Sequence, residues 1–99
     1  MDVIRTYYAE GQLKKEYCLI NNKKEGLYKR YYENRQIDCI CNYINEKNEE
    51  YIRYYSNGQL WVICNYINKK NREHKKYLED GKLVSHKIDD NNISIQTIL

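Results

Sequence analysis

The sequence contains no proline and no phenylalanine, and alanine occurs once in its 99 residues. Without proline, every strand can keep an uninterrupted ladder of backbone hydrogen bonds. Alanine is the strongest helix former, so its scarcity argues against long helices. The chain has instead 12 tyrosines and 12 isoleucines, which are among the residues that favour strands. The composition therefore predicts β structure.

Long apolar runs are also missing. No run approaches the ~20 residues that a helix needs to cross a bilayer, and the first residues, MDVIRTYY, lack the apolar core of a signal peptide. Four cysteines without a secretory signal favour reduced thiols and a cytoplasmic location. The net charge of +3 is too small to indicate a nucleic-acid partner by itself.

The chain repeats itself with a period of 23 or 24 residues. The segment NRQIDCICNYINEKN at 34–48 is nearly the same as NGQLWVICNYINKKN at 57–71. A tyrosine pair marks the same place at 7–8, 31–32 and 54–55, and Tyr77-Leu78 marks it in a fourth copy. We place the repeats of this single domain at 4–26, 27–50, 51–73 and 74–90. We expect 91–99 to be a capping strand or a tail that docks elsewhere.

Each copy contains two extended runs and two turns. The first turn, as at Asn57-Gly58, has the sequence of a two-residue hairpin in which both central residues adopt positive φ. Arg35 replaces the glycine in the second copy, and there we expect Asn34 to carry the left-handed conformation. The second turn, NNKKEG in the first copy, is polar, and we expect a longer link between hairpins.

Alternation along the longer strand separates two faces. One face is apolar throughout, and we expect it to be the packed one, whereas the other mixes isoleucine with asparagine and charge. The apolar face consists of Ile37, Cys39, Cys41, Tyr43, Leu60, Val62, Cys64 and Tyr66. We predict an all-β fold, a single-layer antiparallel sheet of about four stacked β-hairpin repeats in which each hairpin packs against its neighbours.

The segments YYSNGQL and NYINKK in the third copy, and YYAEGQL and NNKKEGLYKRYY in the first, resemble the MORN-repeat superfamily. The nearest form is the variant repeat of antitoxin-like bacterial proteins and of paralogous proteins in large DNA viruses, over about residues 4–88. The resemblance implies an elongated, twisted sheet that contacts proteins or lipids and has no active site. For a viral member it implies the host cytoplasm. Glu50 and Glu73 depart from the pattern, because they stand where the first copy has Gly26.

The cysteines do not form a recognisable metal-binding pattern. Cys39 and Cys41 lack the C-x-x-C spacing of zinc knuckles, and Cys18 belongs to the opposite face. Cys64 is expected two strands from Cys41, beyond the ~7 Å Cα separation that a disulfide allows. We interpret the cysteines as small buried apolar side chains, with a metal site as the alternative.

Catalytic patterns are likewise absent from the sequence. His74 and His86 stand where other copies have tyrosine or isoleucine, and neither is accompanied by a nucleophile and a carboxylate. There is no glycine-rich phosphate loop. We therefore expect no enzyme activity, no cofactor and no small-molecule substrate.

Two groups of residues are candidates for contact with a partner. The first is a tyrosine row, and the second is the basic turn KKNREHKK at 69–76. The other reading is that the tyrosines stabilise the sheet through cross-strand packing and that the lysines protect a turn or edge. The candidate residues are Tyr7, Tyr31, Tyr54, Tyr77, Lys69, Lys70, Arg72, Lys75 and Lys76.

We predict a non-catalytic interaction or scaffold protein that contacts a protein partner, or another copy of itself, through its tyrosine-rich face and basic turns. A second tyrosine row, Tyr8, Tyr32 and Tyr55, points the other way, and the sequence leaves open which row is exposed. The alternative is a module that binds anionic phospholipid at a membrane surface or another polyanion, with single-stranded nucleic acid ranked below lipid.

Overall fold

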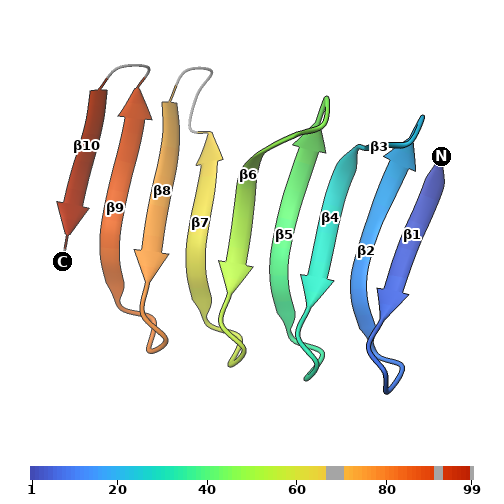
Figure 1. Ribbon diagram of the computed structural model, residues 1–99. Coiled ribbons are helices and arrows are strands. Elements are labelled where there is room, and N and C mark those ends of the chain that lie inside the picture. The colour runs from blue at the N-terminus through green and yellow to red at the C-terminus, as the bar shows by residue number, and fades with distance from the viewer. Residues whose placement is uncertain (67–70, 91–92, 99) are drawn as a thin grey trace.

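The computed structural model describes residues 1–66, 71–90 and 93–98 (Figure 1). These residues form ten strands and no helix. The strands are β1 (Asp2–Tyr7), β2 (Leu13–Ile20), β3 (Lys23–Lys24), β4 (Gly26–Tyr31), β5 (Ile37–Ile44), β6 (Lys47–Tyr54), β7 (Leu60–Tyr66), β8 (Asn71–Tyr77), β9 (Leu83–Asp90) and β10 (Ile93–Ile98).

All ten strands belong to one antiparallel sheet, in which the strands lie side by side in chain order. The two-residue strand β3 lies off this path and pairs only with β2. β1 and β10 form opposite edges, so the sheet is open (Figure 1). The molecule measures only 13 Å along its shortest axis. The predicted all-β, single-layer sheet of stacked hairpins is confirmed.

The C-terminal segment extends the sheet by one strand. β10 pairs with β9 from Ile93 opposite Asp90 to Ile98 opposite Ser85. The rest of the predicted cap or tail, residues 91–92 and Leu99, lies outside the described residues.

The turns after β1, β4, β6 and β8 share one geometry. In the third of them Gly58 N–H donates to the Tyr55 carbonyl at 2.9 Å, and Tyr55 N–H donates to the Gln59 carbonyl at 2.8 Å. One residue per turn is left-handed: Gly11 (φ 99°), Arg35 (φ 73°), Gly58 (φ 89°) and Gly81 (φ 92°). This is a type I turn followed by one left-handed residue. The prediction of two left-handed central residues, with Asn34 as one of them, was wrong.

The other turns are tighter than predicted. Asn21-Asn22 (φ 52° and 64°) and Asn45-Glu46 (φ 52° and 66°) are consecutive left-handed pairs. Across the second pair, Ile44 opposes Lys47. These are two-residue hairpins of the type I′ class, not longer links. The third copy of this turn, 67–70, lies outside the described residues.

A β-bulge accompanies each of the four turns of the first kind. The register shifts between Arg30 and Tyr31, so that Arg30 opposes Cys39 while Tyr31 opposes Ile37, and Asp38 is the extra residue. Because neighbouring residues of β4 point to opposite faces, Ile37 lies on the opposite face from Cys39. The corresponding extra residues of the other bulges are Lys14, Trp61 and Val84.

The bulges correct the predicted faces. Cys39, Cys41 and Cys64 share one side, here named the Cys face, and are 7%, 6% and 1% exposed. Ile37 and Leu60, predicted to lie beside them, are on the other side, here named the Ile face after Ile40, Ile52 and Ile63. Burial of the Cys face was predicted correctly, whereas simple alternation misplaced the residue that precedes each bulge.

Candidate functional site

The predicted tyrosine row lies on the Ile face. Each tyrosine is paired across strands with an aliphatic residue, and paired residues point to the same side of a sheet. The pairs are Tyr7 with Leu13, Tyr31 with Ile37, Tyr54 with Leu60, and Tyr77 with Leu83. We call these eight residues the Tyr–Leu row. Tyr7 is 58% exposed and the other three tyrosines are half-buried, so the row forms part of the open surface of the sheet.

A parallel row on the Ile face has isoleucine at its centre and lysine on either side. Ile52 is paired with Ile40 on one side and Ile63 on the other. Lys29 pairs with Ile40, and Lys75 pairs with Ile63. The centre of the Ile face is therefore uncharged along this row.

Ion pairs occupy both ends of that row. Arg5 Nε donates to Glu16 Oε2 at 2.8 Å, and this hydrogen bond raises the pKa of Arg5. At the other end, Glu73 lies 3.8 Å from Lys75 Nζ and 2.6 Å from His86 Nε2. The Ile face thus combines an apolar centre with charged margins of both signs.

Apolar exposure on the Ile face extends toward the type I′ turns. Val3, Ile20, Leu27 and Ile44 are 45%, 45%, 54% and 61% exposed. Val3, Ile20 and Leu27 join Cys18 in lining a shallow groove of about 610 Å³. Large exposed aliphatic side chains in one place indicate a surface that contacts another molecule.

The Cys face carries a buried acid between two arginines. Arg30 Nε donates to Asp38 Oδ2 at 2.8 Å, and Arg53 Nη2 lies 3.5 Å from Asp38 Oδ1. Burial opposes the charge of Arg30 while Asp38 favours it, and the pKa of Arg30 is raised. Burial first, and Asp38 second, raise the pKa of Tyr32. The Arg53 guanidinium lies 4.4 Å from the centre of the Trp61 ring.

The thiols of the Cys face are packed groups. Cys39 Sγ and Cys41 Sγ are 3.1 Å apart, and this contact, together with burial, raises the pKa of Cys39. Arg72 Nη2 donates to Cys64 Sγ at 3.1 Å. Within 1–66, 71–90 and 93–98, no group of three or more His, Cys, Asp or Glu residues is placed to hold a metal ion.

The Cys face also carries an aromatic cluster that was not predicted from the sequence. Tyr28 stacks on Tyr17 with ring centres 5.5 Å apart and meets Tyr43 edge-on at 6.1 Å. Lys24 Nζ lies 5.2–5.3 Å from all three ring centres. The three tyrosines occupy different positions of the repeat, so comparison of the copies does not bring them together. The strand register brings them together: β2 pairs with β4 next to Tyr17 and Tyr28, and β4 pairs with β5 at Tyr28–Cys41 and Gly26–Tyr43.

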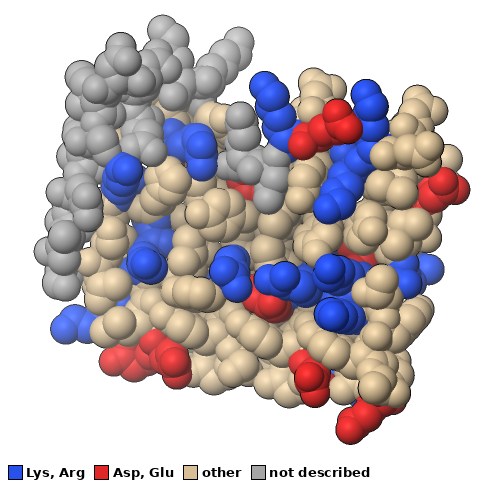
Figure 2. Space-filling model, viewed as in Figure 1, with Lys and Arg blue, Asp and Glu red and all other residues tan. Residues whose placement is uncertain are grey.

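Basic side chains also line up across the Cys face. Lys15 pairs with Arg30, Arg30 with Cys39, and Cys39 with Arg53, and Lys76 continues the row on β8. We call Lys15, Arg30, Arg53 and Lys76 the basic band. Figure 2 shows Lys and Arg side chains in a band across the strands, with an acidic side chain beside it.

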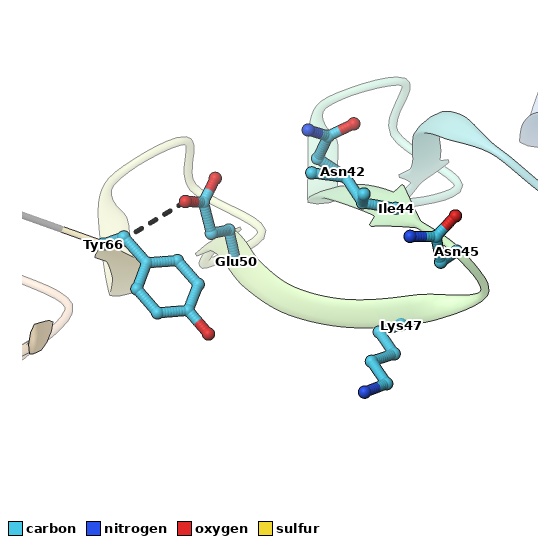
Figure 3. Close-up of a pocket in the computed structure, with 6 residues that line it drawn as sticks. All are labelled: Asn42, Ile44, Asn45, Lys47, Glu50 and Tyr66. Carbon is cyan, nitrogen blue, oxygen red and sulfur yellow. Dashed lines mark hydrogen bonds between the residues drawn. The ribbon is translucent and has the colours of Figure 1, made fainter. Parts of the chain in front are cut away.

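A notch separates the upper parts of β6 and β7, where the pairing between these strands begins only at Tyr51 and Cys64. Its volume is about 260 Å³ (Figure 3). Glu50 stands where the first copy has Gly26, and its Oε1 accepts a hydrogen bond of 3.4 Å from Tyr66 N–H. Asn42, Ile44, Asn45 and Lys47 complete the lining. The single carboxylate is engaged by the backbone, so this notch does not present an acid–base pair.

The structure divides the predicted contact residues between two faces. The four tyrosines and Lys75 are on the Ile face, whereas Arg72 and Lys76 are on the Cys face. Arg72 is engaged with Cys64 and lies 6.0 Å from the Tyr66 ring centre. Lys69 and Lys70 lie outside the described residues. The sequence reasoning missed Leu13, Ile37, Leu60 and Leu83 as surface companions of the tyrosines, because the bulges move them there.

Comparison with known proteins identifies the repeat. A family model described as "MORN repeat variant" matches residues 3–21, 24–45 and 50–68. No curated protein and no solved structure matches the chain. No helix among the described residues is long and apolar enough to cross a membrane.

Proposed function

Because the chain belongs to the MORN repeat variant family, we propose that it is a non-catalytic protein-binding scaffold of the cytoplasm whose contact surface is the Ile face. MORN repeats are generally associated with binding to proteins or membrane lipids. The observation that carries the protein-binding proposal is the Tyr–Leu row. It gives one open face a continuous line of alternating aromatic and aliphatic side chains.

Tyrosine suits this role for a physical reason. Its ring offers a large apolar area with little conformational entropy to lose, and its hydroxyl remains able to hydrogen-bond at the rim. The second tyrosine row is engaged internally, since the hydroxyls of Tyr8, Tyr32 and Tyr55 each donate at 2.7 Å to a backbone carbonyl of the next repeat. The Tyr–Leu row is therefore the tyrosine row that supports partner binding.

The basic residues contribute at the margins of the contact. Lys75 lies beside the central isoleucines of the Ile face, and its ammonium is 3.8 Å from Glu73. Such a rim charge adjusts association rate and specificity more than affinity.

The basic band supports a second candidate function, binding of the Cys face to an anionic membrane surface. Lys15, Arg30, Arg53 and Lys76 stand in one row, and the buried Asp38 offsets part of their charge. Each basic residue near an anionic bilayer contributes about 1 kcal/mol of attraction, and salt screens it. This candidate predicts steep loss of binding as salt rises.

Affinity purification from the native cell tests the main proposal. The tagged chain with Tyr7→Ser, Tyr31→Ser and Tyr54→Ser is compared with the tagged wild type and with the matched Cys-face variant Lys15→Ser, Lys76→Ser. We expect the tyrosine variant to lose its partners while the lysine variant keeps them. Retention of all partners by a folded tyrosine variant would show that the Ile face is not the contact.

Vesicle co-sedimentation tests the second candidate. Binding to vesicles that contain phosphatidylserine, compared with phosphatidylcholine alone, is measured from low to physiological salt. Binding that needs phosphatidylserine, weakens with salt and is lost in Lys15→Ser, Lys76→Ser supports the membrane candidate. Absence of binding at low salt excludes it.

A further inference from the structure

The chain exposes more surface than a compact protein of its size. Its accessible area is 7038 Å², whereas a folded monomer of 12.1 kDa exposes about 6,000 Å². Its radius of gyration is 15.5 Å, against about 13 Å for a compact domain of this length. The difference, roughly 1,000 Å², exceeds the ~800 Å² that each partner buries in a protein interface of standard size.

We propose that a second copy of this chain covers that surface, so that the protein is a homodimer with Ile face packed against Ile face. Stable domains place a sheet against a second layer, and residues 1–66, 71–90 and 93–98 of this chain supply only one layer. Two sheets packed face to face lie about 10 Å apart and interdigitate their inner side chains. The homodimer rests on the proposed function, because it names the partner of the same face.

The Ile face has the layout of such an interface. Its centre is Ile52 with its neighbours Ile40 and Ile63, and the Tyr–Leu row runs beside them. Both margins carry ion-paired groups, Arg5 with Glu16 on one side and Glu73 with His86 on the other. An apolar centre with a charged rim is the usual anatomy of homodimer interfaces.

The Cys face does not have this layout. Its middle row contains Arg30 and Arg53. Asp38 lies between them and is buried even in a single copy of the chain, with 7% of its surface exposed. A second sheet laid on it would bury two arginines with one carboxylate, which is unfavourable. Two copies therefore meet through the isoleucines.

The mass of the purified full chain in solution tests the proposal. Sedimentation equilibrium of the wild type is expected to give twice 12.1 kDa at micromolar concentration. Ile52→Lys places a charge at the centre of the interface and should raise the dissociation constant by ~30-fold or more. The matched control is Val62→Lys, on the neighbouring strand and the Cys face, which should leave the mass unchanged. A monomeric wild type, or a dimer that only Val62→Lys dissociates, would overturn the proposal.

Thiol labelling keeps the test independent of whether Ile52→Lys folds. Cys18 lies on the Ile face in the row of Val3, whereas Cys39, Cys41 and Cys64 are buried on the other side. Maleimide labelling of wild-type Cys18 should accelerate when the protein is diluted and dimers separate. A labelling rate independent of protein concentration argues against the dimer.

The outcomes separate this inference from the proposed function. If the wild type is monomeric but the tyrosine variant still loses a different partner, the dimer alone is wrong. If the tyrosine variant keeps every partner, the Ile face is not the contact, whatever the mass of the purified chain.

Discussion

At Arg35 the hairpin turn holds a residue with a side chain in the left-handed conformation, which such residues disfavour. At φ 73° it occupies the position that Gly11, Gly58 and Gly81 occupy in the other repeats. The preceding Asn34, which we expected to be left-handed, has a different role. Its Oδ1 accepts from Gln36 N–H at 2.9 Å, and its Nδ2 donates to the Ser56 carbonyl at 2.8 Å. The amide side chain thus stabilises the turn and joins it to the next one.

Arg35→Gly should therefore stabilise the protein by about 1 kcal/mol, because glycine removes the left-handed penalty of a side-chain-bearing residue. Urea unfolding followed by circular dichroism measures the change. The reciprocal control is Gly11→Ala. An added Cβ would meet no atom within 4 Å there, so the variant protein should be destabilised only because alanine disfavours a φ of 99°. If Arg35→Gly is less stable than the wild type, the turn holds Arg35 through its side chain.

Stability should fall in alkaline solution. The contact with Cys41, and then burial, raise the pKa of Cys39 above its ordinary value of 9.0. Burial also raises the pKa of Tyr28, Tyr32 and Tyr51 above 10.0. The folded state therefore holds protons that the unfolded state releases, and its stability is complete below about pH 9 and declines above it.

Urea unfolding at successive pH values above neutrality measures this decline, which amounts to at most about 1.4 kcal/mol per pH unit for each such group. The Cys39→Ser variant should have a lower free energy of unfolding at every pH. Its free energy of unfolding should fall less steeply in the first part of the alkaline range, because the thiol no longer titrates. If the free energy of unfolding of the wild type stays constant well above pH ~10, the raised pKa values are not the cause of alkaline destabilisation.

At the scale of the element, each hairpin is joined to the next by side chains of its first turn. Tyr32 hydroxyl donates to the Tyr54 carbonyl at 2.7 Å, and Asn57 Nδ2 donates to the Glu79 carbonyl at 3.2 Å. In the fourth copy Leu78 and Asp80 replace the tyrosine and the asparagine, so neither can donate in this way. Among the described residues there is no fifth turn of this kind whose backbone carbonyls could accept such hydrogen bonds.

Tyr32→Phe should cost about 1 kcal/mol, because it removes one hydrogen bond and leaves the Tyr54 carbonyl without that donor. The matched control is Tyr7→Phe, since Tyr7 is 58% exposed, and it should change stability little. Thermal unfolding of both variants tests the comparison. Equal effects would mean that the turn tyrosines do not join the hairpins.

The sequence predicts the elements better than their faces. The repeat and the tyrosine pairs were sufficient to predict the sheet, its order and the burial of Cys39, Cys41 and Cys64, whereas Cys18, also predicted to be buried, is only half-buried. They were insufficient for Ile37 and Leu60, because a bulge is an extra residue that leaves no mark in a period-two pattern. The composition of the Ile face was only half predicted for the same reason: its tyrosines were grouped in one row, whereas Ile37 and Leu60 were assigned to the other face.

At the scale of the whole molecule, an inner strand of the sheet pairs with a strand on each side, whereas an edge strand pairs with one. β5 has a run of pairs with β4 on one side and β6 on the other, and it carries the buried Cys39 and Cys41. β1 pairs with β2 alone and is mostly exposed. In such an array, opening proceeds from the edge toward the centre, so local stability should differ along the sheet.

Native-state hydrogen exchange should therefore show the slowest amides in β5 and β6 and the fastest strand amides in β1. Packing of a second copy on the Ile face would not reverse this order, because it covers side chains and leaves the outer backbone groups of β1 unpaired. The experiment is run on the purified chain with mass-spectrometric or NMR detection, and Ile52→Lys serves as the comparison that removes the proposed dimer. Protection of β1 equal to that of β5 in both proteins would mean that another strand pairs with this edge in solution, and that the sheet does not end at β1.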